Sequence, residues 1–216
     1  MLSDRILFSD AEVIVLDKPA GVPVTQPKRG GACLEDRLGE LRLGFVHAPL
    51  IVHRLDQDTS GCLLLARHRK ALKRFNAAFA EGRVAKTYWA VLAGVPEGDE
   101  GMIDLALAKR STRERGWWVE PDPKGKPART AWRVLARYDG RALIEFSPET
   151  GRTHQLRAHA LAGFGAAIAG DPVYGGGQGP MLLHARSLEL EREGKQTIAA
   201  IAPLAGHFPA WAQLAA

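Results

Sequence analysis

Two short polar segments carry the residue types that nucleophilic and acid–base chemistry needs. Residues 53–61 read HRLDQDTSG and supply a histidine, an arginine and two aspartates directly before an apolar run. Residues 150–159 read TGRTHQLRAH and supply two arginines and two histidines. Catalytic sites commonly display such groups on loops that are held by a rigid frame. Because the same side chains also form turns, helix caps and surface ion pairs, the residues alone favour that structural interpretation.

Other catalytic patterns fit the chain less well. His154 and His159 are five residues apart, so they do not share the helix face that a paired zinc site requires, and no cysteine accompanies them. The glycine-rich segment 175–179 lacks the following Lys-Ser or Lys-Thr of a phosphate-binding loop. Ser60 is not preceded by the first glycine of a serine-hydrolase elbow. We therefore expect no metal site and interpret the two histidines as structural.

Basic residues concentrate in two segments of the chain. Residues 67–86 hold seven basic residues and one acidic residue, and residues 109–129 hold seven basic and three acidic residues. The whole chain has a net charge of +5, so the remainder is net negative. Such segments are often plain solvated surface, but they also suit a polyanionic partner, and charge leaves both open. Trp117 and Trp118, in the second segment, either stack on bases or are partly buried in a hairpin.

Composition narrows the class of protein further. The longest apolar runs, such as residues 62–66, are far too short to span a bilayer, and the N-terminus lacks the pattern of a signal peptide. Cys33 and Cys62 form no Cys-x-x-Cys pair, and we expect both to be reduced, packed thiols. These features predict a cytoplasmic protein without a membrane-embedded part.

The elements that must position the two polar segments are mainly strands. Apolar runs and turn signals predict strands at residues 12–16, 62–66, 87–93, 131–137, 142–146, 182–190 and 197–201. Apolar residues at helical spacing predict a helix over residues 68–81, and a shorter helix is expected over 155–161, ending near Gly163. The first helix carries Lys70, Lys73 and Arg74 on its polar positions. The chain is thus expected to have an α+β fold rich in strands.

Five segments, in order along roughly 170 residues, resemble the motifs of RluA-type RNA pseudouridine synthases. They are LDKPAG at 16–21, HRLDQDTSG at 53–61, KTY at 86–88, TGRTHQLRAH at 150–159 with GD and YG downstream, and LHA at 183–185. Five motifs in order are a far stronger signal than any one pattern. The resemblance implies a mixed, largely antiparallel sheet with flanking helices and a central active-site cleft.

The resemblance also implies an activity, the isomerisation of uridine to pseudouridine in RNA, with no cofactor. By similarity, Asp56 is the nucleophile, and the sequence leaves open whether it attacks the ribose or the uracil ring. Tyr88 resembles the active-site tyrosine whose hydroxyl lies near C5 of the base. Arg157 matches the arginine that pairs with the nucleophile. Leu183 resembles a residue that lines the uracil pocket, and Arg54 is expected beside the extruded uridine.

The resemblance bears on domain organisation and partners as well. The motifs begin at Leu16, so we expect one catalytic domain over residues 1–216 without an N-terminal S4-like domain, acting as a monomer. RNA contacts would then come from Lys70, Lys73 and Arg74, and the expected substrate is a stem-loop of rRNA or tRNA. Two alternatives are a non-catalytic RNA-binding protein on the same fold and an unrelated hydrolase that uses histidine and aspartate.

Overall fold

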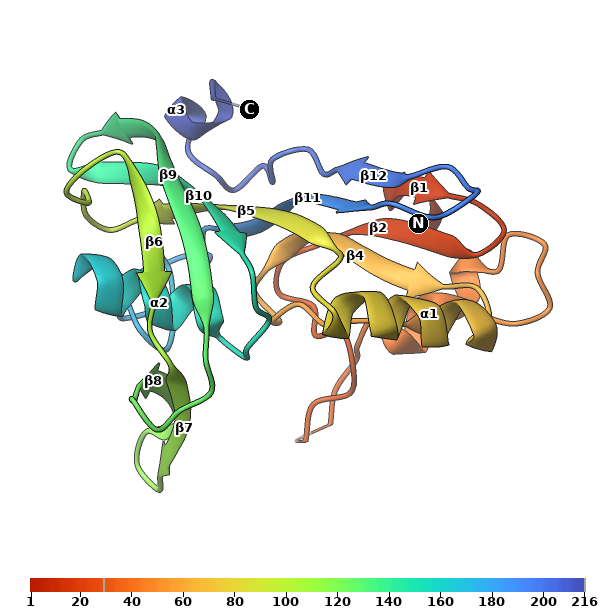
Figure 1. Ribbon diagram of the computed structural model, residues 1–216, viewed down its shortest axis with the longest axis horizontal. Helices are drawn as coiled ribbons and strands as arrows, with labels where there is room; N and C mark the ends of the chain where they lie inside the picture. Colours follow the sequence, from red (N-terminus) through yellow and green to blue (C-terminus); the bar gives the residue numbers. More distant parts are fainter. Residues whose placement is uncertain (29, 216) are drawn as a thin grey trace. The chain divides into compact units, whose positions relative to one another are not determined.

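The computed structural model describes residues 1–28 and 30–215, which form two compact units (Figure 1). The first unit combines Met1–Lys86 with His184–Ala205. The second combines Thr87–Leu183 with the residues from Gly206 onward. Each unit is built on its own group of strands with at least one packed helix, so the α+β class expected from the sequence is confirmed.

The first unit contains a mixed sheet in the order β1-β2-β4-β11, with β12 paired to β11 and β3 paired to β4. All pairings in this unit are antiparallel except the parallel one between β4 and β11. The strands are β1 (Ile6–Ser9), β2 (Val13–Lys18), β3 (Leu50–Ile51), β4 (Ser60–Ala66), β11 (Leu183–Leu190) and β12 (Ile198–Ile201). Every residue of β4 is buried, and helix α1 (Arg69–Ala80) packs alongside it (Figure 1). Two short 3-10 helices, η1 (Leu2–Arg5) and η2 (Glu35–Leu41), complete the unit.

The second unit contains an antiparallel sheet in the order β5-β10-β9-β6 and a separate hairpin of β7 and β8. The strands are β5 (Ala85–Leu92), β6 (Glu100–Asp104), β7 (Leu107–Thr112), β8 (Gly116–Pro121), β9 (Arg129–Tyr138) and β10 (Arg141–Pro148). Helix α2 (Gln155–Phe164) buries Leu156 and Ala160 against Phe146 and Ile144 of the sheet. A short helix, α3 (Ala210–Gln213), lies near the C-terminus.

Most expected elements are confirmed within one or two residues, and the differences have physical causes. Helix α1 starts where predicted because the Nδ1 of His68 accepts the Ala71 N–H and caps it. Helix α2 runs past Gly163 and ends at Gly165, which adopts the left-handed conformation (φ 64°) that a helix end favours. Gly163 thus lies inside the helix, and its lack of a side chain serves packing there, because a Cβ would lie 2.8 Å from Cδ1 of Ile103. Strands β1, β3, β6, β7 and β8 were not predicted.

The sequence predicts two reduced, packed cysteines. Cys33 and Cys62 are both buried and form no disulfide, as expected. Burial raises the pKa of the Cys62 thiol to about 12, so this thiol is protonated at neutral pH. Within residues 1–28 and 30–215, no helix is both long enough and apolar enough to cross a membrane.

Candidate active site

The HRLDQDTSG segment forms the loop that leads into β4, and its first residue is fixed to that strand. The Nε2 of His53 accepts the backbone N–H of Leu64 at 2.9 Å, and its ring stacks on Phe79 of α1 at 4.5 Å. A ring nitrogen that accepts an amide N–H carries no proton, so the imidazole is neutral. Burial lowers the pKa of His53 to about 3, and the nearby Lys86 charge acts in the same direction. His53 therefore anchors the loop and is unsuited to acid–base catalysis at neutral pH.

The middle of this loop is a tight turn that presents Asp56. The Thr59 N–H donates to the Asp56 carbonyl at 3.1 Å, which closes the turn. Leu55 is buried, with 7% of its surface exposed, and holds the turn against the unit. The side chain of Asp56 is half-buried, whereas that of Arg54 is exposed. The loop thus presents the carboxylate of Asp56 and the guanidinium group of Arg54 on a backbone that is held from both sides.

Lys18, the lysine of the LDKPAG motif, fixes this turn through hydrogen bonds of its side chain. Its side chain is fully buried, and its Nζ donates to the carbonyls of Pro19 (2.8 Å), Val22 (2.8 Å) and Gln57 (2.9 Å). Burial lowers the pKa of Lys18 to about 8, although the charges of three nearby aspartates oppose the shift. Because Gln57 directly follows Asp56, Lys18 joins the turn after β2 to the turn of the proposed nucleophile.

The position of Lys18 in the sequence already indicates a structural role, although the resemblance assigned none to this residue. This lysine ends an otherwise apolar strand and is followed directly by Pro19. A lysine on a buried strand must find acceptors for its three N–H groups, and turn carbonyls supply them. Through these bonds Lys18 positions the loop that carries Asp56.

The end of the same loop is locked by a close approach of β4 and β11. Ser60 Oγ lies 2.8 Å from the Nδ1 of His184, and both side chains are buried. Gly61 has a φ of +102°, and a Cβ at this position would lie 2.2 Å from the carbonyl oxygen of Ala185. Only glycine tolerates both the backbone angle and the contact. The TSG and LHA motifs are therefore two sides of one packing contact.

The second polar segment places Arg157 in a buried ion pair. Arg157 is 4% exposed, and its Nε and Nη2 donate to the two carboxylate oxygens of Asp171 at 2.7 and 2.8 Å. Its Nη1 lies 2.9 Å from the Nε2 of His154, and its guanidinium carbon lies 5.3 Å from the ring centroid of Tyr174. Such a bidentate pair fixes the guanidinium plane. The arginine is thus preorganised by residues of its own unit.

Asp171, from the downstream GD motif, is ionised in this arrangement. Burial alone would raise the pKa of its carboxyl, but the hydrogen bonds and charge of Arg157 and the N–H groups of Val173 and Tyr174 outweigh that effect and lower the pKa. The preceding Gly170 has a φ of +76°, and a Cβ there would lie 2.1 Å from the Pro180 carbonyl. Sequence reasoning gave Asp171 no role, although it belongs to the same motif block as Arg157.

The remaining polar residues of TGRTHQLRAH mainly hold α2 in place. Gln155 donates to the Arg129 carbonyl and to Thr130 Oγ1, both at 3.0 Å. The buried His159 places Nδ1 2.9 Å from Thr130 Oγ1 and Nε2 3.1 Å from the Leu105 carbonyl, so Nε2 is the donor. This is the structural role expected for His159. Within the described part of the chain, no cluster of three His, Cys, Asp or Glu residues could hold a metal ion.

Trp117 and Trp118 lie on β8, in the hairpin that one of the two interpretations of this pair expected. The ring of Trp117 lies 4.5 Å from that of His154, and Lys109 Nζ lies 4.5 Å from the Trp117 centroid. Trp117 remains 41% exposed. The neighbouring Val119 N–H donates to the Tyr174 hydroxyl at 2.9 Å, which ties the hairpin to the surroundings of Arg157.

The remaining residues that the sequence predicted for the site lie on β5, β11 and α1. Tyr88 is a half-buried residue of β5 that pairs in register with Phe146 of β10. Leu183 is 3% exposed and belongs to the core cluster of the second unit. Lys70 and Lys73 are exposed on α1. The exposed residue Arg74, by contrast, forms an ion pair with Glu12, so part of its charge is already compensated within the protein. Asp56 and Arg54 belong to the first unit, and Tyr88, Arg157 and Leu183 to the second.

Comparison with known proteins bears on these motifs directly. The family model of the RNA pseudouridylate synthases matches residues 12–162. An uncharacterized RNA pseudouridine synthase of Zymomonas mobilis is 53% identical over 96% of this chain and 97% of its own length. The ribosomal large subunit pseudouridine synthase D of the same organism is 37% identical over 79% of this chain, which spans 56% of that relative.

A solved structure extends the similarity to the fold. The human protein named RNA pseudouridylate synthase domain containing 4 superposes with a TM-score of 0.80 at 26% identity, covering 99% of this chain and 92% of the human chain. A second human protein, RNA pseudouridylate synthase domain containing 1, has a TM-score of 0.76 at 29% identity, over 92% of this chain and 82% of its own. The fold and the family therefore agree with the motifs. The chain belongs to the RNA pseudouridylate synthase family and is an isomerase that acts on RNA.

Proposed function

We propose that this protein converts specific uridines in a structured rRNA or tRNA loop to pseudouridine, with Asp56 as the nucleophile. The observation that carries the proposal is the anchoring of the Asp56 turn. Its backbone is held by Lys18 and by the Thr59 N–H, while its carboxylate is half-buried. A nucleophile needs a fixed position and a reactive group that a substrate can reach. The non-catalytic alternative offers no reason for such an arrangement around a carboxylate.

The proposed reaction is an isomerisation and balances without a co-reactant. The bond between N1 of uracil and C1′ of the ribose breaks, the base turns, and a bond forms between C5 and C1′. The C5 proton leaves, and N1 gains a proton. A carboxylate suits either attack on C1′ or addition to the uracil ring, and Asp56 serves equally in both routes.

Tyr88 and Arg157 complete the proposed catalytic set. Tyr88 would pack its ring on the target base and bring its hydroxyl near C5, where the proton is removed. Arg157 would pair with Asp56 and keep that carboxylate ionised and oriented. A guanidinium group has five N–H donors, and Asp171 and His154 account for three contacts of Arg157, so this role is additional to the buried pair.

The RNA contacts follow from exposure and charge. Arg54 is exposed two residues from Asp56, and we assign it to the extruded nucleotide, because the target base must leave its stack before the carboxylate can reach it. Lys70, Lys73 and Arg74 of α1 are assigned to phosphates, with Arg74 the weakest because of its ion pair with Glu12. Leu183 is assigned to the wall of the uracil pocket.

The wider setting is proposed from the same similarities. The relative named as a ribosomal large subunit synthase supports rRNA as the substrate class, and tRNA stem-loops remain part of the proposal. We place the protein in the cytoplasm and propose that it acts as a monomer.

The test uses the C5 proton as its readout. Total rRNA and tRNA from cells that lack this protein, labelled with tritium at C5 of uridine, should release tritium when the wild-type protein is added. Asp56→Asn should remain folded and bind RNA but release almost none, because an amide is a far weaker nucleophile. Asp58→Asn, from the same loop, is the matched control and should keep most of the activity. Turnover by Asp56→Asn within about tenfold of wild type, about 1.4 kcal/mol of barrier, would contradict the assignment.

A further inference from the structure

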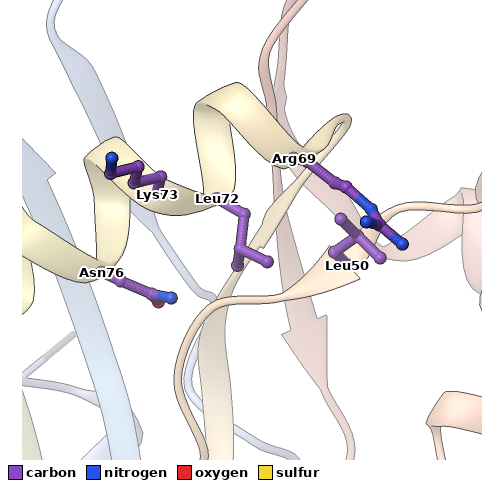
Figure 2. Close-up of a pocket in the computed structure, with 5 residues that line it drawn as sticks. All are labelled: Leu50, Arg69, Leu72, Lys73 and Asn76. Atoms are coloured by element: carbon purple, nitrogen blue, oxygen red, sulfur yellow. The ribbon is translucent and has the colours of Figure 1, made fainter.

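Helix α1 borders a groove that none of the proposed catalytic residues lines. The groove has a volume of about 540 Å³ and is lined by Leu50, Arg69, Leu72, Lys73 and Asn76 (Figure 2). Four of these residues follow helical spacing and so share one face of α1, and Leu50 comes from β3. In Figure 2, Leu72 points from the helix toward the strand side and the Asn76 amide lies on that same side. The floor is therefore apolar, and its rim carries two cations and one amide.

The two cations of the groove, Arg69 and Lys73, are uncompensated by the residues that the structure describes. Among the described residues, neither Arg69 nor Lys73 has a carboxylate within ion-pair distance, and no acidic residue lines the groove. Arg74, one residue further along the helix, is instead bound to Glu12. The basic residues of α1 thus differ: Arg74 is paired within the protein, whereas Arg69 and Lys73 line the groove. A ligand that matches the groove has an anionic part and an apolar part.

We propose that this groove binds an unpaired nucleotide of the RNA substrate, distinct from the target uridine. Arg69 and Lys73 contact its phosphate, and the face of its base lies on Leu50 and Leu72. The Asn76 amide, which both donates and accepts, hydrogen-bonds to the edge of the base. Bases splayed out of RNA loops are commonly recognised through hydrogen bonds to their edges and contacts to their faces, which the Asn76 amide and the two leucines supply here. The volume of the groove is within the range of small-ligand sites.

The inference rests on RNA being the substrate, and it can fail separately from the proposed chemistry. The probe is a single-stranded oligoribonucleotide made only of adenosine, which cannot enter the reaction because it contains no uridine. A ribose-phosphate oligomer of equal length without bases is the comparison. Dissociation constants for both are measured by fluorescence anisotropy across a salt series.

The expected results separate base contacts from phosphate contacts. Wild type should bind the adenosine oligomer more tightly than the abasic one, and Asn76→Ala and Leu72→Ala should each reduce that preference by about threefold to tenfold without changing the salt slope. Lys73→Ala should weaken binding of both oligomers and flatten the log–log salt slope by about 0.7. Arg141→Ala, which removes an exposed arginine of β10 with no ion pair among the described residues, controls for net charge.

The outcomes that overturn the inference are equally distinct. If Asn76→Ala and Leu72→Ala both keep the full preference for the base-bearing oligomer, the groove binds phosphates at most, and the nucleotide site is refuted. Asn76 is exposed, so its substitution does not threaten the fold, whereas Leu72 is partly buried and its variant needs a thermal unfolding control. If these variants lose the preference while wild type releases no tritium from uridine-labelled RNA, the groove stands and the proposed function fails.

Discussion

Replacing Lys18 by methionine tests whether the buried lysine holds the Asp56 turn. Methionine keeps the length and the apolar stem but removes all three N–H donors. The carbonyls of Pro19, Val22 and Gln57 would then lose their partner in a site where Lys18 itself is fully buried. An unsatisfied buried acceptor costs about 2 kcal/mol, so three of them cost about 6 kcal/mol.

Part of that loss is offset, because the ammonium group no longer has to be buried. The pKa of Lys18 is lowered from 10.5 to about 8, mainly by burial, which corresponds to a net cost of about 3 kcal/mol for the charged ammonium that the variant does not incur. The net expectation is a loss of about 3 kcal/mol in the free energy of unfolding. Because the turn loosens as well, the rate of the chemical step should fall by more than tenfold, while RNA affinity changes little.

The assays are urea unfolding at pH 7 and single-turnover tritium release. Lys86→Met is the matched control: burial also lowers the pKa of Lys86, but this residue donates to no carbonyl among the described contacts. Its substitution should change stability by less than about 1 kcal/mol. The pH dependence adds an independent check. The folded-state pKa of Lys18 lies below its unfolded value, so the unfolded chain binds more protons between about pH 8 and 10.5.

The stability of wild type relative to Lys18→Met should therefore rise as the pH increases through that window. The reasoning is refuted if Lys18→Met unfolds within about 1 kcal/mol of wild type at pH 7 and keeps the wild-type single-turnover rate. A stability difference between wild type and variant that falls or stays flat from pH 8 to 10.5 would show that the pKa of Lys18 is not lowered in the folded protein.

Further predictions concern the other anchored groups. Tyr88→Phe should keep RNA affinity and fold but lose tritium release, and weakened binding with an intact chemical step would contradict its role. Asp171→Asn should destabilise the protein by about 3 to 5 kcal/mol in urea unfolding, because it leaves a buried arginine without its counter-charge, and a smaller change would argue against that pair. For His53, the folded pKa of about 3 lies below the unfolded value, so wild type should lose stability as the pH falls from 6.5, and His53→Gln should show a shallower loss between pH 7 and 5. Arg54→Ala should lower the single-turnover rate more than the RNA affinity, and an unpaired target uridine should restore part of the rate; equal losses in both would make it a plain phosphate contact.

Local patterns were enough to predict much of this protein from its sequence. Helix α1 and most of the sheet strands depend on apolar spacing and on capping or turn residues, which act between residues close in the chain. The motifs identified the family because each one preserves a local arrangement, such as the turn closed by Thr59 or the glycine at position 61. Strand β6 and the β7–β8 hairpin escaped prediction because their apolar alternation is short and broken by charged residues.

The partners of the polar side chains were decided only by the tertiary structure. Lys18 and Gln57 are 39 residues apart, Arg74 and Glu12 are 62 apart, and Ser60 and His184 are 124 apart. Local patterns contain no information on contacts between residues so far apart. From the sequence alone, Lys70, Lys73 and Arg74 were therefore predicted to form one basic surface, although Arg74 is paired with Glu12. The physical reason is that burial and charge compensation depend on which distant groups the fold brings within a few ångströms, and these determine whether a charge anchors a loop or faces a ligand.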